Sequence, residues 1–121
     1  MFREVKIGEK TVPMQAVASV DYYYKAAFRV DPIALQADLS IADGAAVIDL
    51  YLRMGFIMAM FAQLHDRKAM LQLNEDGFIE WLDDFDRADL LDAIPEIRAV
   101  YDGERSPSES SKKNNDKPNG E

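Results

Sequence analysis

The sequence predicts an α+β fold in which helices dominate, with an N-terminal β-hairpin packed on a bundle of four to five helices. Three observations lead to this fold class. The first seventeen residues alternate around a glycine turn, helix-capping residues then recur before apolar stretches, and no apolar side chain other than proline follows Gly103. We therefore expect one globular domain over residues 1–102 and a disordered tail over residues 103–121, because nothing in that tail can offset the entropy of ordering.

The hairpin is predicted from residues 3–7 and 11–17, which have an extended pattern on either side of Gly8-Glu9-Lys10. Proline has no amide hydrogen to donate to a ladder, so Pro13 places the second strand at a sheet edge or at a bulge. A two-stranded sheet is only marginally stable alone. We therefore expect the hairpin to lean on the helices or to pair with another subunit, which makes self-association one expectation.

Two short helices are expected next. Ser19 or Asp21 caps the first, which runs through the segment YYYKAAF. Asp31-Pro32 starts the second, because it combines an N-cap acceptor with proline at the first helical position. This second helix is expected to end near Leu39.

Three further helices follow: a long one over about residues 45–64, one through FIEWLDDF and one through LLDAIPEIRAVY. Their capping residues are Ser40 or Asp43, then Asn74, then Asp86. Pro95 either kinks the last helix or restarts it, and Gly103 suits a C-terminal cap. The last two helices are amphipathic, and their apolar stripes consist of Phe78, Ile79, Trp81, Leu82 and Phe85, then Leu90, Leu91, Ile94, Ile97 and Tyr101.

The long helix contains MGFIMAMFA, residues 54–62, without a polar side chain. A membrane span needs about 20 such residues. Extending this stretch to that length would bury Asp49 and Arg53, so a core helix is the better interpretation and no membrane partner is expected. Met54 and Met58 are nevertheless candidates for an adaptable docking groove, because methionine side chains repack easily.

Acidic residues are concentrated in one part of the chain. The net charge is −8, but residues 1–74 hold eight basic and eight acidic residues and residues 103–121 hold four of each, whereas residues 75–102 hold ten acids and two arginines. An acidic surface repels phosphate backbones, which argues against nucleic-acid binding. It suits either a basic protein partner or plain solvation, and both interpretations stay open. The candidate partner contacts on this face are Glu80, Asp83, Asp84, Asp86 and Asp89.

The sequence contains no recognisable catalytic or cofactor-binding pattern. It has no cysteine and a single histidine, His65, which excludes disulfides, thiolate chemistry and a usual zinc site. No Ser-His-Asp set, phosphate-binding glycine loop or nucleotide fingerprint is evident. We therefore expect a binding protein rather than an enzyme, without a cofactor. The N-terminus MFREVKIGEK lacks the apolar core of a signal peptide, so the expected location is the cytoplasm.

A calcium-responsive module is an alternative, because QLNEDGFIEWLD over residues 72–83 resembles an EF-hand loop with Gly77 at the turn. Its possible oxygen ligands are Asn74, Asp76 and Glu80. Two ligand positions fit poorly, since Gln72 stands first and Asp83 stands twelfth, where a longer glutamate side chain is usual. The sequence also offers no second loop to pair with this one.

Three stretches, in order, resemble the tail assembly chaperones of long-tailed bacteriophages and prophages of Gram-positive hosts. They are the hairpin VKIGEKTVPMQAVASV leading into YYYKAAFRVDPI, the apolar helix LYLRMGFIMAMFAQL, and the pattern FIEWLDDFDRADLLDAIPEIRAVY. Together they cover about residues 3–101. The resemblance rests on the order and the pattern of these stretches.

The resemblance implies a non-enzymatic role in building the phage tail. Such chaperones bind the tape-measure protein in the host cytoplasm, keep its hydrophobic segments soluble, help to recruit tail-tube subunits and are absent from the mature virion. In many relatives a ribosomal frameshift near the end of the gene adds a second domain, and codons for Lys112-Lys113-Asn114 would suit an A-rich slippery run. A small acidic cellular adaptor is the remaining alternative.

Overall fold

The computed structural model describes residues 1–38 and 44–103 of the chain. A two-stranded antiparallel hairpin comes first and helices follow, which confirms the predicted α+β fold with helices dominant. Within the described residues there are six helices, one more than the upper end of the prediction. The predicted caps Ser40 and Asp43, the helix end near Leu39 and all of the predicted tail over residues 103–121 except Gly103 lie outside the described residues.

The N-terminal hairpin consists of β1 (Phe2–Ile7) and β2 (Lys10–Gln15), joined by the two-residue turn Gly8-Glu9. Gly8 has a φ of +65°, a left-handed conformation that glycine adopts without strain. One face of the hairpin is apolar and faces the core. Its buried side chains are Val5, Ile7 and Met14.

Pro13 lies in β2 without removing a hydrogen bond from the ladder. The Ala16 amide donates to Met1 O at 2.7 Å and the Met1 ammonium donates to Ala16 O at 2.6 Å, so these residues form a hydrogen-bonded pair. Such pairs alternate with non-hydrogen-bonded ones, and Glu4 faces Pro13 three positions further along. The proline therefore sits where its missing donor would have pointed out of the sheet, which confirms the predicted edge strand.

Helices α1 (Val20–Phe28) and α2 (Pro32–Asp38) begin where the sequence predicted. Ser19 precedes α1 as its N-cap, although its side chain makes no capping hydrogen bond. Asp31 caps α2, because its Oδ1 accepts hydrogen bonds from two amides of the first turn at 3.0 and 3.4 Å. Local side-chain chemistry thus sets the start of α2.

Helix α3 (Gly44–Leu64) is the central helix of the fold. Eight of its residues between Leu50 and Ala59 are buried. With 21 residues and a mean hydropathy of 1.6 over an 18-residue window, it is long and apolar enough to cross a membrane, as the core helices of soluble proteins also can be. Its burial against the other elements agrees with the predicted core helix.

A single helical turn, α4 (Arg67–Met70), follows α3 and was not predicted. Asp66 is its N-cap and accepts a hydrogen bond from the Lys68 amide at 3.3 Å. Met70 is fully buried and anchors the turn. Four residues are too few to show a helical period, so only the capping aspartate could have indicated this element.

Helices α5 (Glu75–Leu82) and α6 (Arg87–Asp102) complete the described chain. Asn74 caps α5 as predicted, with its Oδ1 accepting an amide hydrogen bond at 2.9 Å. Asp86 is the N-cap residue of α6 but makes no capping hydrogen bond with its side chain. Helix α6 continues through Pro95 without being restarted, and it ends at Gly103, whose φ of +74° confirms the predicted C-terminal cap.

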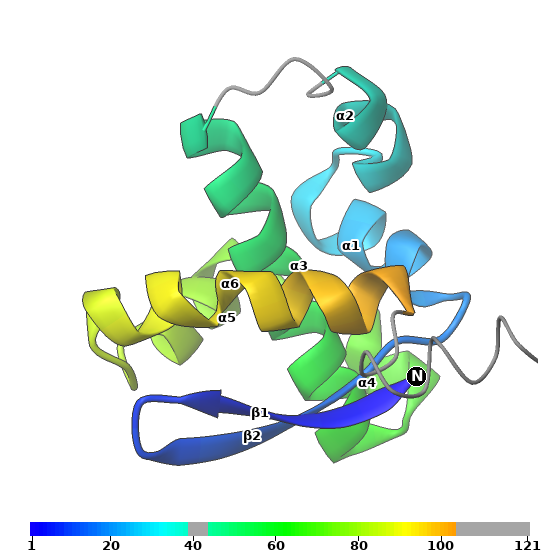
Figure 1. The fold of residues 1–121 in the computed structure, drawn as a ribbon. Coiled ribbons are helices and arrows are strands. Elements are labelled where there is room, and N and C mark those ends of the chain that lie inside the picture. Colours follow the sequence, from blue (N-terminus) through cyan, green and yellow to red (C-terminus); the bar gives the residue numbers. More distant parts are fainter. Residues whose placement is uncertain (39–43, 104–121) are drawn as a thin grey trace, which may run out of the picture.

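Figure 1 shows α6 crossing α3 steeply, with α1 and α2 beside α3 and the hairpin on the other side of α6. The crossing is close, because a Cβ on Gly55 would lie 3.2 Å from side-chain carbons of Ile97. β2 contacts α3 while β1 contacts α6, so the hairpin closes the core between these two helices. Tyr101 adds a link from α6 to α1, since its hydroxyl donates to Asp21 at 2.5 Å.

Candidate functional site

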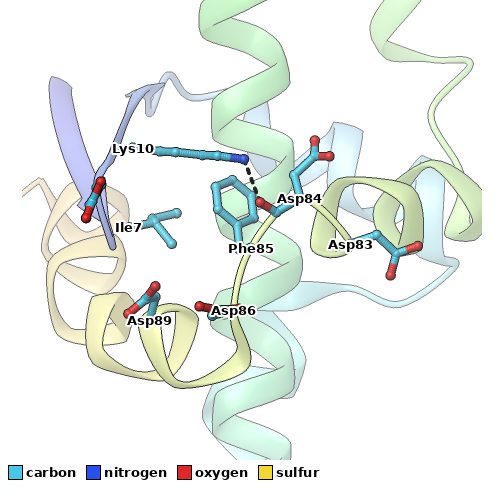
Figure 2. Close-up of a pocket in the computed structure, with 8 residues that line it drawn as sticks. Ile7, Lys10, Asp83, Asp84, Phe85, Asp86 and Asp89 are labelled. Atoms are coloured by element: carbon cyan, nitrogen blue, oxygen red, sulfur yellow. Dashed lines mark hydrogen bonds between the residues drawn. The ribbon is translucent and has the colours of Figure 1, made fainter.

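An acidic cleft of about 340 Å³ lies between the tip of the hairpin, the α5–α6 connection and the first turn of α6. Ile7 and Phe85 form its apolar part and Lys10 is the cation in its lining (Figure 2). Among the described residues, five carboxylates line this cleft: Glu9, Asp83, Asp84, Asp86 and Asp89. The cleft therefore combines a small apolar base with a strong excess of negative charge.

The α5–α6 connection positions three of these acids within one tight turn. The Asp84 amide donates to Trp81 O at 3.2 Å and the Phe85 amide donates to Leu82 O at 3.1 Å. These bonds end α5 and place residues 83–86 in the connection between α5 and α6. Acidic side chains are favourable at the start of α6, because the amides there carry partial positive charge.

The hairpin tip reaches this connection because Gly8 fits against α6. A Cβ on Gly8 would collide with Asp89 Oδ2 and lie 2.9 Å from Asp89 Cγ, so a larger residue would force the carboxylate away. The left-handed φ at Gly8 adds a second reason for glycine. Glycine at the hairpin tip thus lets the tip form one wall of the acidic cleft.

Lys10 reaches across the cleft from β2. Its Nζ donates to the backbone oxygen of Asp84 at 2.6 Å and lies 5.2 Å from the centre of the Phe85 ring (Figure 2). Cations bind both carbonyl oxygens and aromatic faces. In the described part of the chain, none of the side chains of Asp83, Asp84, Asp86 and Asp89 forms an ion pair. Their charge is therefore available to a partner.

An apolar groove of about 330 Å³ adjoins the acidic cleft, where the first half of α3 meets α5 and α6. Phe85 lines both the groove and the cleft, and Arg87 is the charged residue of the groove. Ile48 is 37% exposed there, so apolar surface remains in contact with solvent. The other lining residues of the groove are Leu52, Leu82, Leu90 and Leu91.

Four of the predicted contact residues come together at the acidic cleft, namely Asp83, Asp84, Asp86 and Asp89. Glu80 is exposed on α5 but does not line the cleft. Whether any of them contacts a partner stays a prediction.

The predicted methionine groove is wrong for this structure. Met54 and Met58 have no exposed surface and belong to the core around α3. A docked protein cannot touch them unless the core opens. The sequence indicated an apolar helix, but only the packing of the hairpin and α6 determines which of its sides is covered.

The EF-hand interpretation does not agree with the structure. A calcium loop winds its ligands around one point, whereas residues 75–82 form the regular helix α5. The Asn74 side chain, a supposed ligand, is instead engaged in capping that helix. Among the described residues, no group of three or more acidic or histidine side chains is arranged to hold a metal ion.

The hairpin side of the cleft and the α3 side of the groove were not predicted from the sequence. Lys10 lies 74 residues from Asp84, and no local pattern indicates that pairing. Ile79, predicted on the buried stripe of α5, is instead 48% exposed. The apolar stripes predicted on the last two helices were wide, and this width could have indicated the groove. A stripe wider than the helix packed against it leaves apolar side chains exposed to solvent.

A second charged cluster lies at the other end of α5, and we call it the Arg53 clamp. The Arg53 guanidinium donates to both carboxylate oxygens of Glu75, at 2.5 and 2.9 Å, and to Asp49 at 2.9 Å. Its centre lies 4.7 Å from the ring centres of both Phe28 and Phe78. The clamp therefore joins α1, α3 and α5.

The pKa values of the clamp follow from these contacts. The hydrogen bonds from Arg53 lower the pKa of the Glu75 carboxyl below its ordinary value, and they raise the pKa of the guanidinium. Burial, followed by the nearby Asp49 charge, raises the pKa of Tyr24 to about 12. Arg53 is paired with both carboxylates and lies against two buried or partly buried rings, so we interpret the clamp as a structural feature.

No protein-family model, curated protein or solved structure matches this chain.

Proposed function

We propose that this chain is a phage tail assembly chaperone, which binds the tape-measure protein in the host cytoplasm, helps to recruit tail-tube subunits and is absent from the mature virion. The observation that supports the proposal best is the exposed apolar groove adjoining the acidic cleft. Both surfaces border the α5–α6 segment, which contains the third stretch of the sequence resemblance.

The physical requirements of such a chaperone fit this pair of surfaces. Binding hydrophobic segments requires apolar surface that the fold leaves uncovered, and the groove supplies it between α3, α5 and α6. Keeping the complex in solution requires net charge, and the chain carries −8. The unpaired carboxylates place part of that charge next to the apolar surface. Holding a partner in this way requires no turnover of a substrate.

Co-expression with the tape-measure protein encoded nearby tests this proposal. We expect the soluble fraction of the tape-measure protein to rise several-fold with this chain, and the two proteins to co-purify. A charge-matched unrelated acidic domain, expressed to the same level, is the control for a general effect of added protein. Equal insolubility with and without this chain would refute the proposal.

Gene order separates this function from that of a small acidic cellular adaptor. A tail-tube gene before this one and a very long gene after it are expected for a tail assembly chaperone. Neighbours without any tail gene would favour the adaptor instead.

A further inference from the structure

The apolar groove and the acidic cleft meet at one side chain and form a continuous surface. Phe85 lines both, with Leu82 and Leu91 on the groove side and Asp86 and Asp89 on the cleft side. The two regions are adjacent, because the same α5–α6 connection borders each of them. A bound segment can therefore contact both regions at once.

The two regions select different chemistry from such a segment. The groove is mostly apolar and of a size that takes one or two aliphatic side chains. The cleft carries five carboxylates, so it selects a cation. A segment with apolar residues and a nearby lysine or arginine satisfies both, whereas a purely apolar or an acidic segment satisfies one at most.

Lys10 shows how the cleft holds an ammonium group. Its Nζ already binds the Asp84 carbonyl and faces the Phe85 ring, yet the side chain is exposed and forms no ion pair among the described residues (Figure 2). Because the contact of Lys10 with the Asp84 carbonyl leaves the neighbouring carboxylates unpaired, a cation that pairs with those carboxylates can replace it. The chain's own lysine thus occupies a cation position within the cleft.

We propose that the groove and the cleft form one docking site for an amphipathic segment of the tape-measure protein, whose apolar side chains enter the groove and whose lysine or arginine displaces Lys10 from the cleft. This inference rests on the proposed function. It adds the chemistry of the bound segment, its orientation relative to Phe85 and a competitor within the chain. The carboxylates of the cleft and the apolar lining of the groove are the reason for choosing an occupant that carries both basic and apolar side chains.

The test uses synthetic 20-residue segments that together cover the tape-measure protein, each labelled for fluorescence anisotropy and titrated with the full chain. We expect the retained segments to combine apolar residues with lysine or arginine. Changing that basic residue to glutamate should weaken binding about tenfold, and raising the salt concentration should weaken binding of the unchanged segment.

Matched variants of the chain then examine each part of the site with the tightest segment. Ile48→Glu should weaken binding about tenfold, while Ile33→Glu, on an isoleucine that is 59% exposed on α2, should change it less than about twofold. The double variant Asp86→Asn with Asp89→Asn should weaken binding about fivefold, because asparagine keeps the size and capping ability of aspartate but removes the charge.

The control for that double variant is Asp76→Asn with Asp92→Asn, which changes the net charge equally at exposed positions outside the cleft. Lys10→Met should tighten binding about threefold, since it removes the competing ammonium and keeps an apolar stem. Lys6→Met, on the exposed face of the same hairpin, makes the same change in net charge and should have less than about a twofold effect.

The outcomes separate the inference from the proposed function. If segments bind the chain but the cleft and groove variants behave like their controls, the docking site is refuted while the chaperone function stands. Weaker binding by Lys10→Met would refute the displacement of Lys10. If no segment binds and co-expression leaves the tape-measure protein insoluble, both proposals fail.

Discussion

The two ends of α5 carry similar residues but engage them differently. At its start, Glu75 and Phe78 belong to the Arg53 clamp, where the carboxylate is paired and Phe78 is 3% exposed and part of the core. At its end, Asp83, Asp84 and Phe85 lie at the junction of the cleft and the groove, with unpaired carboxylates and a partly exposed ring. Similar residue types thus stabilise the fold at one end and remain available at the other. Pairing with a cation, rather than residue type, therefore distinguishes the structural acids from the candidate contact acids.

The largest expected difference between the two ends concerns their phenylalanines. Phe78→Ala should lower the free energy of unfolding by about 3–4 kcal/mol, because it leaves a cavity beside the rings of Phe28 and Phe56. Phe85→Ala should cost only about 1–2 kcal/mol, since part of that ring already faces solvent. Urea unfolding followed by far-UV circular dichroism measures both values. Equal losses would mean that the end of α5 is as much a part of the core as its start.

Removing Arg53 at the start of α5 and Lys10 near its end should give a smaller difference in the free energy of unfolding. Arg53→Ala should cost about 2 kcal/mol, because the guanidinium lies between two rings and binds two carboxylates. Lys10→Ala should cost less than about 0.5 kcal/mol, since its side chain is exposed. The same unfolding measurement compares them. A loss for Lys10→Ala as large as that for Arg53→Ala would contradict the exchangeable role given to Lys10.

The smallest expected effect is the pH dependence of the clamp. Because the folded-state pKa of Glu75 lies below the ordinary value of 4.5, the contribution of its carboxylate is present above that value and is lost as the pH falls through the lowered pKa. Between about pH 5 and pH 3, the free energy of unfolding should therefore fall less for Glu75→Gln than for the wild type. The difference between the two falls should be under about 1 kcal/mol, because the carboxylate is largely exposed. Thermal unfolding across this range measures the slopes. Glu80→Gln, at another exposed position of α5, is the control. If its stability depended on pH in the same way as that of Glu75→Gln, the effect could not be assigned to the clamp.

The sequence predicted those elements whose causes are local. The side chains of Asp31 and Asn74 bond to amides within three residues, and Gly103 ends α6 through its own backbone, so each boundary was visible in the pattern. The candidate site was predicted only in part. The acids between Asp83 and Asp86 are close in sequence, so their proximity could be predicted without knowing the tertiary structure.

The remaining features depend on contacts between distant parts of the chain. Met54 and Met58 looked like surface candidates because the pattern of an apolar helix does not show which sides are covered, and the hairpin and α6 cover them here. Lys10 entered the cleft only through the fold, as did Ile48 and Leu52 in the groove. Tertiary packing therefore determined the shape of the site, whereas local chemistry determined its charge.

The contact between β1 and α6 has a consequence for how the protein is made. The first strand leaves the ribosome long before residues 87–102 are synthesised, yet those residues complete the core around Val5 and Ile7. At a synthesis rate of about 5–20 residues per second, the apolar face of α3 remains exposed for several seconds before α6 can pack against it. During that interval the nascent chain exposes the kind of surface that other proteins bind, and its own aggregation competes with folding until α6 emerges.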